Sequence, residues 1–207
     1  MKPSLDAPFL LFEDHRCLLA ASAEHIAAQL QRRFADPARG ALLVFDADTG
    51  TQRDLDLSLG QAQLEAHLRE IESQRQPASE TVPDAKPAGV RRGPGRPRLG
   101  VVSREVTLLP RHWTWLNEQP GGASVSLRKL VEQARRASSE KDQVRKAQER
   151  CYRFINTLAG NLSGFEEACR ALYAADAAGF DAQTRLWPVD IRKHALRLAA
   201  PALGLAS

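Results

Sequence analysis

The side chains with the clearest chemistry lie between residues 91 and 111, a segment that holds six arginines and a single acid, Glu105. A guanidinium is permanently charged and presents its N–H donors in a planar fork that fits phosphate groups. Residues 91–153 contain 15 Lys and Arg against 6 Asp and Glu, whereas residues 1–90 contain 9 against 14. This asymmetry predicts a local positive field that attracts a polyanion, and DNA is the partner that we expect.

Within this segment, residues 93–98 read Gly-Pro-Gly-Arg-Pro-Arg. An arginine suits the negative, narrow minor groove of A·T-rich DNA, and Gly and Pro keep the backbone extended and close to the groove floor. The pattern resembles an AT-hook, although Pro94 stands where the usual hook has arginine. A plain solvated linker is the alternative interpretation. The candidate DNA contacts of this basic arm are Arg92, Gly95, Arg96, Pro97 and Arg98.

A strand, a helix, a glycine turn and a second helix are predicted in that order after the arm. Val106 and Leu108 alternate with polar residues, which is the period of a strand. A helix follows over residues 111–119 and is ended by Pro120-Gly121-Gly122. Ser124 is a suitable N-cap for the next helix. On that helix an apolar stripe with helical spacing is formed by Leu127, Leu130, Val131 and Ala134.

This layout, over residues 101–136, resembles the ribbon-helix-helix family of bacterial DNA-binding proteins. In that family two chains pair their strands into a ribbon that enters the major groove. The resemblance implies a homodimer in which Ser103 and Thr107 face the DNA, while backbone N–H groups near Ser124 meet a phosphate. Glu105 departs from the pattern, because it points a negative charge into the groove. The alternative is that the strand pairs within its own chain.

The other patterns predict an α+β protein in which a small N-terminal ββαββα domain (1–75) is followed by a flexible basic linker (76–100). The ribbon-helix-helix-like element (101–136), with its one short strand, precedes a helical C-terminal region (137–207). Apolar runs and helical spacing give the following elements: strands at 9–12, 17–20, 41–45 and 51–57, and helices at 22–34, 61–71, 138–158, 165–175, 181–186 and 189–198. Phe34, Tyr152 and Tyr173 are expected on the buried faces of their helices.

The residue spacing gives little support for calcium binding, catalysis or a cofactor. Asp46-x-Asp48-x-Gly50 lacks the later ligands of a calcium loop, and a tight turn is expected instead. The chain has no nucleophile, phosphate-loop or metal motif, so we expect neither catalysis nor a cofactor. The three cysteines are dispersed, every apolar run is too short to span a membrane, and no secretory signal is recognised. These features favour a cytoplasmic protein that does not enter the membrane.

The order of segments as a whole resembles a bacterial family classed only as a domain of unknown function. The residues that carry this resemblance are Leu43–Asp46, Asp54–Leu57, Gly93–Val101, Arg104–Trp113, Gly121–Val125, Gly164–Ala168 and Trp187-Pro188. The family name implies no activity. Two hypotheses therefore stay open: a DNA-binding regulator or nucleoid-associated protein, and a protein-interaction module that does not bind nucleic acid. In the second, the acidic N-terminal domain and the helical tail bind another protein.

Overall fold

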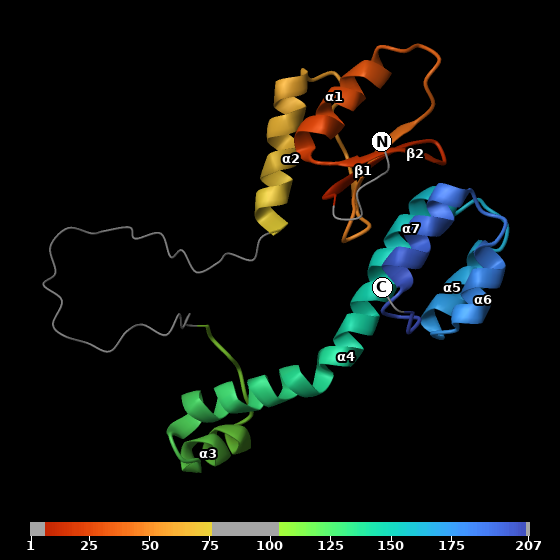
Figure 1. Ribbon diagram of the computed structural model, residues 1–207. Helices are drawn as coiled ribbons and strands as arrows, with labels where there is room; N and C mark the ends of the chain where they lie inside the picture. The colour runs from red at the N-terminus through yellow and green to blue at the C-terminus, as the bar shows by residue number, and fades with distance from the viewer. Residues whose placement is uncertain (1–6, 76–103, 206–207) are drawn as a thin grey trace, which may run out of the picture. The chain divides into compact units, whose positions relative to one another are not determined.

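A computed structural model describes residues 7–75 and 104–205. The fold is α+β, with a small antiparallel sheet and helices near the N-terminus followed by a helical C-terminal region (Figure 1). The chain divides into two compact units. The first unit combines residues 1–73 with residues 139–207, and the second unit comprises residues 74–138. The predicted fold class is thereby confirmed at the level of the N-terminal sheet and the helical C-terminal region.

The sheet of the first unit contains four antiparallel strands in the order β2-β1-β3-β4. Their bounds are β1 (Phe9–Glu13), β2 (Arg16–Ala21), β3 (Leu42–Asp46) and β4 (Gln52–Arg53). Leu11 pairs with Leu19 on one side and with Val44 on the other. The hairpin predicted from the two apolar runs is confirmed, and Asp14 takes the positive φ of 50° that its tight turn requires. β4 is shorter than the predicted strand 51–57.

Both faces of this sheet are covered. Phe9 and Leu11 pack with the helices α1 (Ala23–Phe34) and α2 (Gln61–Arg75) in one core. Leu10 and Phe12, which point to the opposite face, belong to a second core. A strand that is buried on both faces needs apolar side chains at every position rather than at alternate ones. This requirement explains the unbroken apolar run at residues 9–12.

The second core joins the sheet to the C-terminal helices (Figure 1). These helices are the C-terminal part of α4 (Gly122–Ala159), α5 (Phe165–Tyr173), α6 (Ala177–Thr184) and α7 (Val189–Ala199). At its centre the rings of Phe12, Phe45 and Phe154 meet edge to face, with centroids 5.2 to 5.8 Å apart. Such pairs add to the hydrophobic burial. The N-terminal sheet and the C-terminal helices thus share one core.

Hydrogen bonds fix the turn at residues 46–50 against the same helices. The buried Asp46 carboxylate accepts from the backbone N–H groups of Asp48 and Thr49, at 3.1 and 3.0 Å. Arg153 of α4 donates to the carbonyl of Thr49 at 3.0 Å, and Arg197 of α7 donates to the carbonyl of Ala47 at 2.6 Å. The predicted tight turn is confirmed. We call this arrangement the arginine clasp, since guanidinium groups of two helices hold the turn by its carbonyl oxygens.

Three predicted core residues lie at the edge of their helices instead. Phe34 is 39% exposed at the end of α1, with the guanidinium of Arg39 4.8 Å above its ring. Tyr152 and Tyr173 are 37% and 53% exposed and face each other, with ring centroids 6.2 Å apart. These predictions were wrong because helical spacing marks a stripe and does not tell how much of its width is covered.

Two helix boundaries also differ from prediction. The helices expected at 124–136 and 138–158 are one helix, α4, because no Gly or Pro interrupts the chain between Ala123 and Ala159. The short helix expected at 181–186 begins earlier, as α6 at Ala177. Asp176 caps it by accepting a hydrogen bond from the backbone N–H of Gly179 at 2.9 Å.

Candidate nucleic-acid interface

The candidate DNA contacts fall into two groups. Arg92, Gly95, Arg96, Pro97, Arg98 and Ser103 lie outside the described residues. Thr107 and Ser124 are described, and both are exposed. The described part of the second unit, residues 104–138, therefore carries the structural argument. It contains an extended segment, α3 (Pro110–Glu118), a glycine turn and the first half of α4.

The strand predicted at 104–108 is not formed in the single chain. Residues 104–109 have no regular secondary structure, and Val106, expected to face a core, is 56% exposed. A short strand is stable only when its backbone groups pair with a neighbour. The segment has no such neighbour within the described chain, so the pairing inside its own chain is not formed there, and the ribbon between two chains stays a prediction. Thr107 lies exposed on an extended segment.

Ser124 does not cap the second helix. α4 begins at Gly122, which places Ser124 inside the first turn rather than ahead of it. Its Oγ accepts from Arg128 Nη2 at 3.4 Å, and its carbonyl accepts from Arg128 Nε at 3.1 Å. The turn before the helix depends on Gly121 and Gly122, whose φ angles are 90° and 74°. The N–H of Gly122 already donates to the carbonyl of Gln119 at 2.9 Å, so it is not available to a phosphate.

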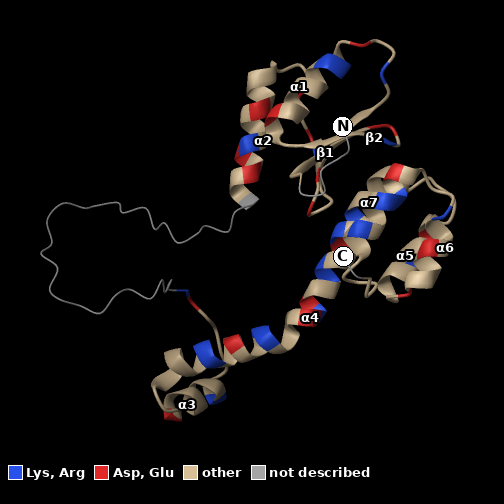
Figure 2. Cartoon of the chain, in the orientation of Figure 1, with Lys and Arg blue, Asp and Glu red and all other residues tan. Residues whose placement is uncertain are grey.

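Several basic side chains of the second unit were not singled out from the sequence. Arg104, Arg111, Arg128 and Lys129 are exposed, and none forms an ion pair with a carboxylate of the described residues. Lys and Arg occur along both α3 and α4 (Figure 2). Sequence reasoning passed over Arg128 and Lys129 because cations on the polar face of an amphipathic helix are commonplace.

The two remaining arginines of residues 104–138 share one acid. Glu132 accepts from Arg135 at 2.9 and 3.0 Å and from Arg136 at 2.9 Å. These hydrogen bonds lower the pKa of Glu132 to about 2. With two guanidinium groups around one carboxylate, this cluster keeps a positive charge.

In the first unit most arginines are instead engaged by the protein itself. Arg33 pairs with Glu13, Arg53 pairs with the buried Asp46, and Arg192 pairs with Asp181. Others donate to backbone carbonyls, as in the arginine clasp. Some cations of the first unit, such as Arg32 and Arg185, are also exposed without an ion pair to a described residue, but residues 104–138 carry six Lys and Arg against three acids and so have a net positive charge.

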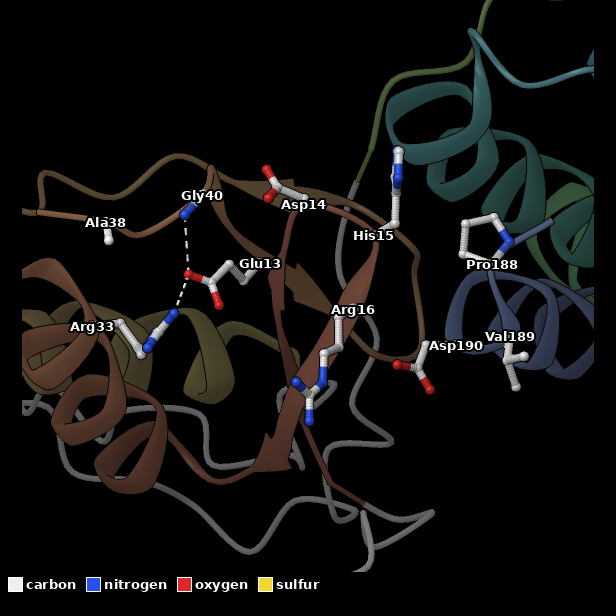
Figure 3. A pocket seen from close by; sticks show the side chains of 10 residues that line it. All are labelled: Glu13, Asp14, His15, Arg16, Arg33, Ala38, Gly40, Pro188, Val189 and Asp190. Atoms are coloured by element: carbon white, nitrogen blue, oxygen red, sulfur yellow. Dashed lines mark hydrogen bonds and ion pairs between the residues drawn. The ribbon is translucent and has the colours of Figure 1, made fainter. Parts of the chain in front are cut away.

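The first unit has a pocket of about 550 Å³ beside the β1–β2 turn (Figure 3). Glu13 lines it and accepts hydrogen bonds from Arg33 and from the backbone N–H of Gly40. Asp14 accepts from the N–H of Ala41, and Asp190 accepts from the N–H of Cys17. Each carboxylate of the pocket thus already accepts a hydrogen bond from a backbone N–H group or a guanidinium of the protein. The pocket has mixed charges and gives no clear preference for an anion or a cation.

The buried titratable groups of the first unit are suited to packing. Burial raises the pKa of the Cys151 thiol to about 12 and that of Cys17 to about 11, which disfavours the reactive thiolate. Burial also lowers the pKa of His194 to about 3, with Arg197 adding to the effect. Within the described ranges, no group of three or more His, Cys, Asp or Glu side chains could hold a metal ion. Helices long and apolar enough to cross a membrane are absent from those ranges as well.

Comparison with known proteins gives a family and no activity. Residues 8–199 match the family model described as "Uncharacterized protein conserved in bacteria (DUF2239)". The match spans nearly the whole chain and includes both units. No curated protein and no solved structure matches the chain.

Proposed function

This chain belongs to that bacterial family of uncharacterised proteins, and we propose from its own residues that it binds double-stranded DNA through the second unit, which includes the basic arm. The observation that carries the proposal is the free positive charge of residues 104–138. Arg111, Arg128 and Lys129 are exposed and have no carboxylate partner in the described chain. Phosphate contacts of this kind supply most of the affinity of non-specific DNA binding.

Side-chain chemistry indicates which residues contact phosphates and which contact base edges. Lys and Arg fix a protein on the phosphate backbone, whereas base edges are read by side chains that can donate and accept hydrogen bonds. Thr107 is exposed between Arg104 and Arg111, so it is the described side chain that we assign to a base edge. In the arm, Arg96 enters the minor groove of A·T-rich DNA, and Arg92 and Arg98 contact phosphates. This activity suits a regulator or a nucleoid-associated protein.

The test is fluorescence anisotropy with labelled A·T-rich and G·C-rich duplexes over a salt series. We expect the logarithm of the affinity to fall linearly with the logarithm of salt concentration, by about 0.9 per phosphate contact. The Arg96→Ala/Arg98→Ala variant is expected to flatten this slope by roughly two and to lose any preference for A·T-rich duplex.

A matched control removes the same charge from the first unit. Arg32 and Arg185 are exposed and have no ion pair with a described residue, so Arg32→Ala/Arg185→Ala is expected to leave the salt slope unchanged. Equal losses in the two double variants would indicate a general charge effect rather than a site. If neither duplex binds at low salt, the DNA proposal is wrong, and the chain is better understood as a protein-interaction module.

A further inference from the structure

The described part of the second unit, residues 104–138, contains no hydrophobic core of its own. Within residues 104–138, Leu116 is the one apolar side chain that is buried. The first unit, by comparison, buries both faces of its sheet. Ordering these residues costs backbone entropy, and the burial of one leucine side chain offsets only a small part of that cost. The second unit therefore requires a further source of apolar burial to keep its fold.

The apolar side chains that could supply this burial are present and exposed. Leu109 and Trp113 are 49% and 37% exposed and lie one helical turn apart, in line with the buried Leu116. On α4, Leu130 and Val131 are 43% and 64% exposed, within the stripe that the sequence marks as a core face. We group these exposed side chains, together with Val106, which is 56% exposed, as the open apolar surface.

We propose that a second copy of this chain covers the open apolar surface, so that two second units share one core. The proposal deepens the proposed function, on which its biological meaning rests, because it names the partner that completes the DNA-binding unit. Exposed apolar side chains with polar residues around them are a feature of protein–protein interaction sites. The following arguments identify the occupant as a second copy rather than an unrelated protein.

The first argument is area. If a large side chain has about 150–250 Å² of surface, the exposed parts of the five residues amount to roughly 400 Å² per chain. A homodimer interface is about two-thirds apolar, so the complete contact would cover roughly 600–700 Å² per chain, close to the ~800 Å² of a standard interface. The surface is thus large enough for a specific dimer, and no additional region of the chain is needed.

The second argument is the chemistry of the surface and of its edge. The five side chains carry no charge, so two identical surfaces meet without like-charge repulsion. Residues 104–109, which include Val106 and Leu109 of this surface, have no regular secondary structure and lack a strand partner among the described residues. An extended segment brought beside its own copy by a two-fold axis can exchange backbone hydrogen bonds with it. An unrelated partner would have to supply both an apolar surface and a strand edge.

The experiment is sedimentation equilibrium of the full-length chain without DNA, over a range of concentrations. We expect the mass to approach twice the 22.8 kDa of one chain. Val131→Glu is the main variant, because a side chain that is 64% exposed in the single chain can be replaced there without disturbing that chain. A carboxylate at this position must lose its water when a second copy binds. We expect dimerisation to weaken at least tenfold.

The control is Gln133→Glu, which adds the same charge at an exposed position of the same helix outside the open apolar surface. It is expected to dimerise like the wild type. A wild-type chain that stays monomeric at its highest soluble concentration overturns the proposal. So does a dimer that Val131→Glu and Gln133→Glu affect equally, since its interface must then lie elsewhere.

The experiments distinguish a failure of the DNA-binding proposal from a failure of the dimer proposal. A dimer that binds neither duplex removes the proposed function and leaves the shared core intact. A monomer that binds DNA with the expected salt dependence removes the shared core and leaves the proposed function. Circular dichroism of Val131→Glu distinguishes a lost dimer from an unfolded chain, because the helices of the first unit should retain their signal.

Discussion

The two units of this protein differ in how their apolar side chains are used. In the first unit, the sheet is packed on both faces, and Phe12, Phe45 and Phe154 have almost no exposed surface. In residues 104–138 the helices are well formed, yet Trp113 and Val131 remain open to solvent. Local signals such as a proline at the start of α3 and a glycine turn before α4 are thus sufficient to specify helices. They do not provide a core.

The largest expected effect tests whether the first unit depends on its central aromatic cluster. Phe154 contacts Phe12 and Phe45 and lies 4.6 Å from the ring of His194, so Phe154→Ala leaves a large cavity. We expect the free energy of unfolding to fall by about 3–5 kcal/mol in urea titrations. Tyr152→Ala, on the same helix but 37% exposed, should cost less than about 1 kcal/mol. Similar costs for both variants would mean that the core lies elsewhere.

A second effect is the pH dependence of the stability of the first unit, which contains the buried His194. His194 is 8% exposed, and its pKa of about 3 lies below the ordinary 6.5 because burial disfavours the charged ring. Between these two pH values the His194 ring is protonated in the unfolded chain and neutral in the folded chain. The free energy of unfolding therefore falls as pH decreases from about 6.5 toward 3. Between pH 7 and 4.5 we expect His194 to account for a loss of roughly 2–3 kcal/mol.

The measurement is urea unfolding of the wild type and of His194→Leu at several pH values. Carboxylates titrate in both proteins, so the difference between the two curves isolates the histidine. The free energy of unfolding of the wild type, minus that of His194→Leu, should decrease as pH falls. A gap that stays constant with pH would show that His194 is protonated and accommodated in the folded state.

The smallest effect is the difference between two glycine substitutions, one of them in the turn that the arginine clasp holds. Gly50 has a φ of 65°, and a Cβ at this position would lie 2.2 Å from the carbonyl oxygen of Arg150. Gly204 has nearly the same φ, 64°, with no atom within 4 Å of its would-be Cβ. Gly204→Ala should cost about 1–2 kcal/mol for the backbone conformation alone. We expect Gly50→Ala to cost about 1–2 kcal/mol more in thermal or urea unfolding. Equal costs would show that the turn can move away from α4.

Sequence patterns predicted the local elements well, because helices and hairpins depend on residues close together in the chain. The β1–β2 hairpin, α1, α3 and α7 were found from apolar spacing and turn residues. The packing of the C-terminal helices on the N-terminal sheet was not predicted. The unbroken apolar run at residues 9–12 contained that signal, since such a strand needs cover on both faces. Which segment provides the cover depends on contacts across more than 100 residues.

The candidate site was predicted only in part. The basic character of the region could be counted from the sequence, whereas the lack of carboxylate partners for Arg111, Arg128 and Lys129 required coordinates. Ser124 was misplaced as a cap because α4 already begins at Gly122, directly after a turn in which Gly121 and Gly122 take positive φ angles. The strand at 104–108 was predicted from alternation, and alternation cannot tell whether a neighbouring strand exists.

The arginine clasp joins parts of the chain that the ribosome makes at different times. Arg197 and its acceptor Ala47 are 150 residues apart in sequence, so the sheet is synthesised long before the helices that cover its second face. At about 5–20 residues per second, the face that carries Leu10, Phe12 and Phe45 stays uncovered for roughly 8–30 s. Nascent chains truncated before α7 should therefore be the forms that chaperones bind and that aggregate, whereas release of the complete chain ends the exposure.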